Sequence, residues 1–305
     1  MDGHQEELDK VPDESVAGKQ ITESEERKAS EKIKVTLLIS TYNWPGALSL
    51  CLNAVLLQTR LPDEIVIADD GSKDETREVI ERFRERSVIP IVHCWQKDKG
   101  FRKTRILNIA IAQSSGEYII QIDGDIVMDS RFIADHLSQM RPHTFLRGSR
   151  AGLSDAFTQE VLASGRIDFS AFSQHLHNRF NAFRSRFLAM FLCRKSDDVR
   201  HVKGCNTSFW KEDFISVNGY NNDLCGWGHE DIELAARLYN SGVALRIIKA
   251  LAVGYHLYHP FYSRADEDAN FAVYNQVMMH KISRCENGYK ECLSPKYDED
   301  DKVWR

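Results

Sequence analysis

The stretch VTLLISTYNWPGALSLCLNAVLLQTRLPDEIVIADDGSKDET, residues 35–76, decides the fold. It is entered through an apolar run over 34–40, rich in leucine and β-branched residues, which is typical of a buried strand. The apolar residues that follow have helical spacing. A second buried strand is predicted over 64–69, and a second helix follows it, where Ser72 and Glu75 have the spacing of a capping box.

The same alternation continues downstream. A short strand is predicted over 90–95, a helix over 103–115 and a fourth strand over 117–125. Strands that alternate with helices predict an α/β fold with a parallel, doubly wound sheet, in which ligands bind outside the carboxyl ends of the strands. Three polar clusters follow those ends: Ser40, Thr41 and Asn43; Asp69 and Asp70; Asp123 and Asp125.

The composition excludes several classes of protein. The 305 residues are 42% hydrophobic and 28% charged, which is ordinary for a globular chain. A net charge of −5 gives no basic footprint for nucleic acid, so we expect no nucleic-acid partner. No apolar run reaches the length of about 18 residues that a membrane span needs. Seven scattered cysteines and the lack of an apolar leader favour a reduced, cytoplasmic setting.

The pair Asp123 and Asp125 is the strongest chemical signal in this half of the chain. Alternate residues of a strand share a face, and Gly124 between them allows close approach of a ligand. Two converging carboxylates repel unless a cation joins them, and hard oxygen ligands suit Mg²⁺ or Mn²⁺. Alone, the pair is weak evidence and more typical of two solvated turn acids. Its position at the end of the fourth strand favours the metal site.

Two nucleotide-binding motifs are absent. The first strand is followed by neither G-x-G-x-x-G nor G-x-x-x-x-G-K-[ST]. Their absence argues against a dinucleotide-dependent dehydrogenase and a P-loop phosphotransferase.

Three stretches together resemble the family-two glycosyltransferases, which have the GT-A fold. Residues 35–76 and 99–133 resemble the donor half of that family through its D-x-D motif. Residues 203–238 resemble the C-terminal half of galactosyltransferase-type and chondroitin-polymerase-type members. The motifs occur in the family's order, which makes the resemblance over 34–260 more specific than any one of them.

The resemblance implies a nucleotide pocket for a UDP-sugar. Asp70 would bind the uracil or the ribose, and Asp123 would contact the ribose or support the metal. The other implied pocket residues are Ser40, Thr41, Asn43, Arg105 and Asn108. Plain alternatives stay open, since Asn43 is a good turn residue, Asp70 could only shape a turn and Arg105 could be an exposed helix residue.

The resemblance also implies the metal ligands. Asp125 would hold Mn²⁺, or Mg²⁺, directly, with Asp123 in support. His256 best matches the histidine that completes the site, and His259 is the fallback. A histidine on an apolar strand is otherwise typical of a packed core residue.

The motif GWGHED, residues 226–231, would form the acceptor half of the site. By resemblance, Asp231 is the catalytic base, Glu230 binds or orients the acceptor, and Trp227 stacks on a sugar next to Gly228. Direct attack then inverts the anomeric configuration. The alternative is that the two acids only favour a helix N-terminus.

The predicted function is an inverting, metal-dependent transfer of a hexose or N-acetylhexosamine from a UDP-sugar to a glycan or lipid-linked saccharide hydroxyl. A sugar-nucleotide nucleotidyltransferase and a noncatalytic sugar-binding relative are the alternatives. The predicted organisation is a disordered acidic tail (1–32), a nucleotide-sugar-binding half (33–129), an acceptor-binding and catalytic half of the same domain (130–260) and a C-terminal helical extension (261–305).

Residues 178–195 mix five basic side chains with phenylalanine, leucine and methionine at helical spacing. Such a helix could lie on an anionic membrane at the inner face of the cell membrane. We favour the alternative that it covers its own core or a subunit partner. Residues 262–285 are predicted to form a closing helix.

Overall fold

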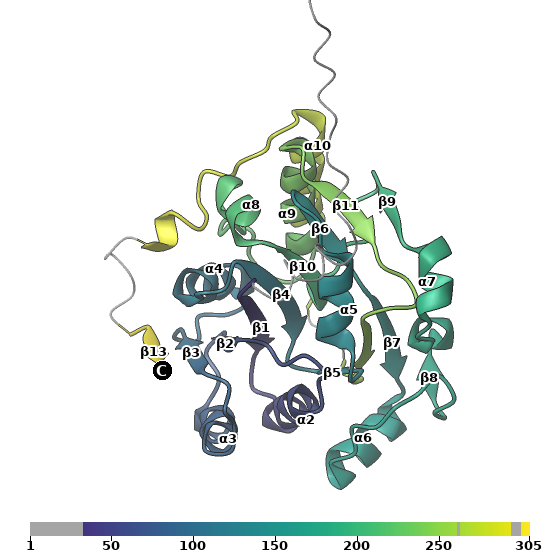
Figure 1. Cartoon of the computed structure of the whole chain (residues 1–305). Helices are drawn as coiled ribbons and strands as arrows, with labels where there is room; N and C mark the ends of the chain where they lie inside the picture. Colours follow the sequence, from purple (N-terminus) through teal and green to yellow (C-terminus); the bar gives the residue numbers. More distant parts are fainter. Residues whose placement is uncertain (1–32, 261–262, 294–299) are drawn as a thin grey trace, which may run out of the picture. The chain divides into compact units, whose positions relative to one another are not determined.

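The computed structural model describes residues 33–260, 263–293 and 300–305, which form one compact unit (Figure 1). The predicted tail over 1–32 lies outside the described residues. The helices of the described residues are α2 (Pro45–Leu56), α3 (Asp74–Arg84), α4 (Lys103–Gln113), α5 (Phe132–Gln139), α6 (Asp155–Ser164), α7 (Arg186–Leu192), α8 (Lys211–Ser216), α9 (Glu230–Asn240) and α10 (Glu267–Met279). Two short 3₁₀ helices are η1 (Arg179–Ala182) and η2 (Glu291–Leu293). Among the described residues, none of these helices is long and apolar enough to cross a membrane.

A large mixed sheet forms the centre of the molecule. Its strands lie in the order β13 (Lys302–Trp304), β3 (Ile91–Trp95), β2 (Glu64–Asp69), β1 (Val35–Thr41), β4 (Tyr118–Asp123), β10 (Asn206–Trp210), β6 (Thr144–Arg147), β11 (Ala244–Ile247) and β9 (Arg194–Ser196). The four strands β3, β2, β1 and β4 are parallel to one another, as the alternation of strands and helices predicts. The α/β fold class is therefore confirmed.

The strand order positions the functional site. β1 pairs with β2 on one side and with β4 on the other, so the chain reverses its direction of winding at β1. Ligands of doubly wound sheets bind at such a switch point, beyond the carboxyl ends of the strands. Ser40 and Asp123 lie opposite each other in the register at that end.

Helices cover both faces of the parallel strands. Leu37 and Ile39 of β1 belong to the apolar cluster that includes α2 and α3, while Leu38 belongs to the cluster that includes α4 and α9. This alternation follows from the two-residue period of a strand. Because both faces are buried, the strands are apolar throughout, which is why the sequence shows continuous apolar runs here.

A smaller sheet carries the histidine side of the site. Its strands lie in the order β5 (Ile126–Met128), β12 (Val253–His256), β7 (Ser149–Leu153) and β8 (Leu176–His177). β5 directly follows Asp125, and its Ile126 is in register with His256 of β12. The pairing therefore brings the second acid of the D-x-D motif next to a histidine that is far away in sequence.

Two predictions about helices are wrong. The capping box at Ser72 does not form, because α3 begins at Asp74 and the Ser72 hydroxyl accepts a hydrogen bond from the Asn43 backbone instead. Residues 178–195 are not one helix that covers the core. They break into η1, α7 and the start of β9, and most apolar side chains of α7 are exposed.

The C-terminal region adds one feature that the sequence does not predict. The closing helix exists as α10, within the predicted range. Further on, β13 pairs antiparallel with β3 at the edge of the large sheet. The described end of the chain is therefore part of the sheet as well as a helical extension.

Candidate functional site

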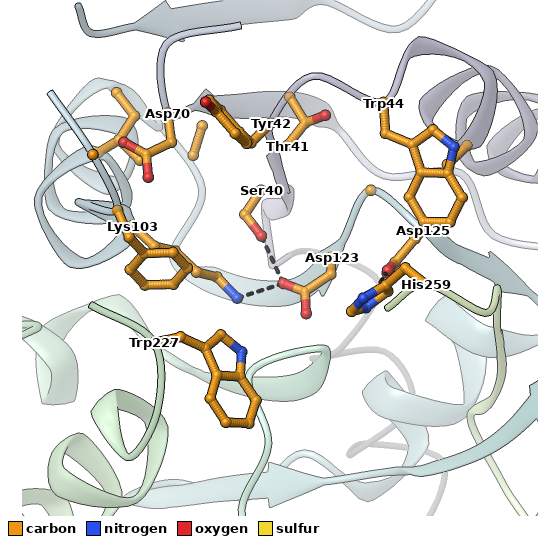
Figure 2. A pocket seen from close by; sticks show the side chains of 16 residues that line it. Ser40, Thr41, Tyr42, Trp44, Asp70, Lys103, Asp123, Asp125, Trp227 and His259 are labelled. Carbon is orange, nitrogen blue, oxygen red and sulfur yellow. Dashed lines mark hydrogen bonds and ion pairs between the residues drawn. The ribbon is translucent and has the colours of Figure 1, made fainter. Parts of the chain in front are cut away.

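A cavity of about 260 Å³ lies at the carboxyl ends of β1, β2 and β4, where the topology places a ligand site. Charged and aromatic side chains both line its walls (Figure 2). The lining residues with polar or aromatic side chains are Ser40, Thr41, Tyr42, Trp44, Asp70, Phe101, Lys103, Asp123, Asp125, Trp227 and His259.

Two hydrogen-bond donors hold the side chain of Asp123 in the cavity. The Ser40 hydroxyl donates to Asp123 Oδ1 at 2.6 Å and the Lys103 ammonium donates to the same oxygen at 2.7 Å (Figure 2). Burial raises the pKa of Asp123, but the Lys103 charge and the two hydrogen bonds outweigh it and hold the pKa below its usual value. Asp123 is therefore an ionised acceptor with a fixed orientation.

Asp125, His256 and His259 form a candidate metal centre. Oδ2 of Asp125 lies 3.5 Å from Nε2 of His256 and 3.4 Å from Nε2 of His259, and one ligand atom of each lies within 4.8 Å of the others. The second oxygen of Asp125 is buried without a hydrogen-bond partner among the described residues. Burial lowers the pKa of His256, so its imidazole is neutral and free to offer a lone pair. Both predicted histidines thus reach the same carboxylate.

Asp70 closes the opposite wall. Its carboxylate accepts hydrogen bonds from the side chain of Gln96 and, at 2.9 Å, from the backbone of Arg102. Burial nevertheless raises its pKa to about 6. A buried carboxylate that lines a cavity and keeps free acceptor capacity suits recognition of a donor group on a ligand.

Glu230 and Asp231 are the first two residues of α9, and both lie within range of the Lys103 charge. Asp231 Oδ2 accepts a hydrogen bond from the Gly204 backbone at 2.7 Å, and its other oxygen is buried without a partner among the described residues. A side chain at Gly204 would overlap with Asp231, so this approach requires glycine. Burial raises the pKa of both acids, which Lys103 opposes. The cavity lining itself includes neither acid.

Trp227 stands on the far side of the cavity from the sheet (Figure 2). The guanidinium of Arg264 lies 5.5 Å from the centre of its ring, a cation–π contact. Gly226 and Gly228 on either side have φ angles of +72° and +114°, which L side chains rarely adopt. These two glycines therefore allow the loop conformation in which the indole ring of Trp227 lines the cavity.

Three residues predicted to bind nucleotide do not line the cavity. Asn43 accepts a hydrogen bond from the Lys73 backbone at 2.9 Å and so joins two loops. Asn108 is fully buried and bonds the Tyr220 backbone in both directions, as acceptor and as donor. Arg105 binds Gln96 and Asp301. Their side chains hold neighbouring segments in place, and the sequence pattern alone could not distinguish this role from a ligand contact.

The glycosyl transferase family 2 model matches residues 36–200, more than half of the chain. The chain belongs to that family. A second model, described as the N-terminal domain of galactosyltransferase, matches residues 184–260, which include the GWGHED loop and His256. Both halves of the resemblance to family-two glycosyltransferases are therefore confirmed.

Among curated relatives, chondroitin synthase of Escherichia coli is 23% identical over 275 residues, which cover 81% of this chain and 38% of the relative. Validoxylamine A glucosyltransferase of Streptomyces hygroscopicus subsp. limoneus is 26% identical over 226 residues, covering 70% of this chain and 49% of the relative. The family-2 chain thus spans less than half the length of each of these two relatives.

Solved structures confirm the GT-A fold. Staphylococcus aureus TarS 1–349 in complex with UDP has a TM-score of 0.55 at 16% identity, covering 85% of this chain and 68% of that one. GalNAc-T7, solved with UDP, GalNAc and Mn²⁺, has a TM-score of 0.58 at 14% identity, covering 80% and 48% of the two chains.

Sequence reasoning missed Lys103 and three aromatic wall residues of this family-2 site, Tyr42, Trp44 and Phe101. A signal for Lys103 was present. It is the first residue of the helix that follows β3, so the winding of the sheet brings it to the carboxyl edge. The aromatic residues lie in loops, whose path the strand and helix pattern does not define.

Proposed function

We propose that this family-2 chain is an inverting, metal-dependent glycosyltransferase that moves a hexose or N-acetylhexosamine from a UDP-sugar to a saccharide hydroxyl. The observation that carries the proposal is that one cavity at the switch point of the sheet is lined by Asp70, Lys103, Asp123, Asp125 and His259. His256 lies next to it, beside Asp125. Glycans and lipid-linked saccharides are the acceptor classes that the proposal covers. Two similar structures were solved with UDP, which supports the donor class, and one of them also with Mn²⁺, which supports the metal.

The donor would lie across the carboxyl ends of the parallel strands. Asp70 would accept a hydrogen bond from the uracil or ribose, and Ser40 and Thr41 would line the same pocket. The ammonium of Lys103, now paired with Asp123, is the cation best placed to meet the diphosphate. Asn43, Arg105 and Asn108 would support these loops rather than contact the nucleotide.

Asp125, His256 and His259 would hold the metal, with Asp123 in support. The fit rests on their donor set, one carboxylate and two imidazoles, and on the unpartnered buried oxygen of Asp125. Such a set suits Mn²⁺, with Mg²⁺ as the alternative. When bound, the ion would neutralise charge on the departing diphosphate as a Lewis acid.

Asp231 would take the proton of the acceptor hydroxyl. As it does so, the acceptor oxygen bonds to the anomeric carbon, and the bond from that carbon to the phosphate oxygen breaks, so that UDP leaves with the electron pair. Burial raises the pKa of Asp231, which makes the carboxylate a stronger base. Glu230 would orient the acceptor and Trp227 would stack on its sugar. Attack opposite the leaving group inverts the configuration, giving a β-linkage from an α-linked donor.

The test is UDP release from a panel of UDP-sugars with Mn²⁺, with and without EDTA, across a panel of saccharide acceptors. We expect release from at least one donor, lost with EDTA and in Asp125→Asn. Asp198→Asn changes a partly exposed acid that pairs with Arg200, and as the matched control it should behave as wild type. No release from any UDP-sugar with any acceptor would disprove the transferase.

A further inference from the structure

One surface of the molecule is both apolar and basic, and the proposed function does not use it. Residues 169–196 contain no Asp or Glu. They carry phenylalanines at 169, 172, 180, 183, 187 and 191 and basic side chains at 179, 184, 186, 194 and 195. We call the exposed part of this segment the Phe/Arg surface. It stands out because the whole chain has a net charge of −5.

The apolar side chains of the Phe/Arg surface face solvent. Phe180 is 92% exposed, and Phe172, Phe187, Met190 and Phe191 are each at least 68% exposed. The rings of Phe187 and Phe191 lie 5.4 Å apart, so they form a joint patch on α7. Exposed apolar patches on a protein surface mark sites of interaction with other proteins or with membranes.

Helix α7, which carries Phe187, Met190 and Phe191, is anchored to the rest of the fold. Ala189 is the one buried residue of α7. At its start the Ser185 hydroxyl accepts from the Leu188 backbone at 3.3 Å, and the Ser185 backbone donates to Ala250 at 2.9 Å. The outward direction of the apolar face is therefore built into the fold.

Basic side chains flank the apolar patch in the sequence. Arg179, Arg186, Arg194 and Lys195 are exposed. Arg184 is the exception, since it donates two hydrogen bonds to Asp135, at 2.6 and 2.7 Å. Lys249 lies close enough to Arg147 and Arg194 for their positive charges to lower its pKa, in addition to the larger effect of burial.

We propose that the Phe/Arg surface docks on an anionic lipid membrane. Phenylalanine, leucine and methionine would enter the interface between headgroups and acyl chains, while arginine and lysine would meet anionic headgroups. A second copy fits less well. A two-fold contact sets the same patch against itself, and would bring the basic side chains of both copies together.

The Phe/Arg surface lies on the same side of the fold as the strand that carries His256. η1 and β8 adjoin β7, which pairs with β12, the strand that carries His256. Docking would therefore bring this side of the catalytic unit to the bilayer, where a lipid-linked saccharide would be presented. That consequence rests on the proposed function; the docking itself does not.

The test is co-sedimentation of the full chain with vesicles of phosphatidylcholine alone or with about 30 mol% phosphatidylglycerol. We expect wild type to bind the anionic vesicles at least about tenfold more tightly, with weaker binding at higher salt. Phe180→Ser/Phe187→Ser/Met190→Ser and Arg186→Glu/Arg194→Glu/Lys195→Glu should each lower that binding about tenfold or more. Val88→Ser/Met279→Ser, exposed apolar residues elsewhere, should bind as wild type.

Each outcome of these experiments either supports or overturns membrane docking. No binding of wild type to anionic vesicles, or binding that the serine variant retains, overturns the proposal. Dimers in sedimentation velocity that the serine variant lacks, without vesicle binding, would assign the surface to a second copy. UDP release with a water-soluble acceptor should be unchanged in the surface variants. Vesicle binding by a chain that releases no UDP would leave docking intact and disprove only the transferase.

Discussion

Nη2 of Arg105 lies 2.6 Å from Oδ2 of Asp301, although the two residues are 196 positions apart in the chain. The same guanidinium donates to Gln96 at 2.6 Å, and Gln96 donates to the pocket carboxylate of Asp70. A connected set of hydrogen bonds therefore runs from the C-terminal segment before β13 to the donor pocket. The C-terminal segment therefore helps to position a residue that we assign to nucleotide recognition.

Asp301→Ala is the first prediction. Without its partner, Arg105 no longer holds Gln96 in one orientation, so Asp70 loses its defined direction. We expect UDP to bind about three- to tenfold more weakly, and the donor KM to rise with little change in kcat. The loss of a largely buried charge partner should also lower the free energy of unfolding by about 1–3 kcal/mol. Isothermal calorimetry with UDP and thermal unfolding measure the two effects.

Asp300→Ala is the matched control, because Asp300 pairs with Lys97 in a solvent-exposed ion pair. Such pairs contribute about 0–1 kcal/mol, so both readouts should stay near wild type. If Asp301→Ala changes unfolding but leaves UDP affinity intact, the link to the donor pocket is wrong. Partial rescue by Asp301→Glu would support it.

The pH dependence of donor binding should follow Asp70. Burial raises the pKa of Asp70 to about 6, and only the ionised carboxylate accepts a hydrogen bond from the uracil or ribose with both oxygens. UDP affinity should therefore fall as the pH drops through about 6. Asp70→Asn should bind UDP more weakly at neutral pH and lose this dependence. A wild-type profile that is flat between about pH 5 and 7 would contradict the assignment.

The same shift predicts the opposite slope for stability. An acid whose folded pKa exceeds its unfolded pKa binds its proton more tightly when folded. The contribution of Asp70 is therefore fully present below its unfolded value near 3.8 and lost as the pH rises through about 6. In Asp70→Asn, urea unfolding should lose that part of its pH dependence.

The sequence predicts the fold well because the fold depends on patterns that are local. The apolar runs of β1, β2 and β4 and the helical spacing between them define a parallel sheet and the edge where ligands bind. The predicted capping box at Ser72 is wrong because a tertiary hydrogen bond takes the place of the local one. The Ser72 hydroxyl accepts from Asn43, a residue 29 positions earlier, and the helix begins without it.

The site was predicted less completely, for a related reason. Residues at strand ends, such as Ser40, Asp70 and Asp123, reach the cavity because the topology places them there. Residues on a helix depend on its rotation, and α4 turns Lys103 to the cavity and Asn108 into the core. Spacing along α4 predicts which residues share a face, but it does not say which face meets the ligand.

Metal affinity should depend on Asp125 and on both histidines. We expect Asp125→Asn to abolish tight Mn²⁺ binding, and His256→Ala and His259→Ala each to weaken it about 10- to 100-fold by removing one of three donors. Mn²⁺ titration followed by electron paramagnetic resonance reports this without turnover. His201→Ala, an exposed histidine near Asp198, is the control and should bind as wild type. Wild-type affinity in His256→Ala would leave His259 and Asp125 as the protein ligands.

Asp231→Asn is the decisive variant for the chemistry. Asparagine keeps the acceptor oxygen for the Gly204 backbone, which donates at 2.7 Å, but it cannot take a proton. Turnover should fall about 10²- to 10⁴-fold, the usual contribution of a general base, while UDP binding and thermal unfolding change little. Glu230→Gln should instead raise the acceptor KM more than it lowers kcat.

Asp223→Asn provides the comparison from the same loop, since this exposed acid accepts from Asn287 and lies outside the cavity lining. It should retain wild-type turnover. The roles of the two adjacent acids are then distinguished by which kinetic constant each variant changes. If Asp231→Asn turns over near wild type while Glu230→Gln loses turnover, the base is Glu230, and the division of roles between them is reversed.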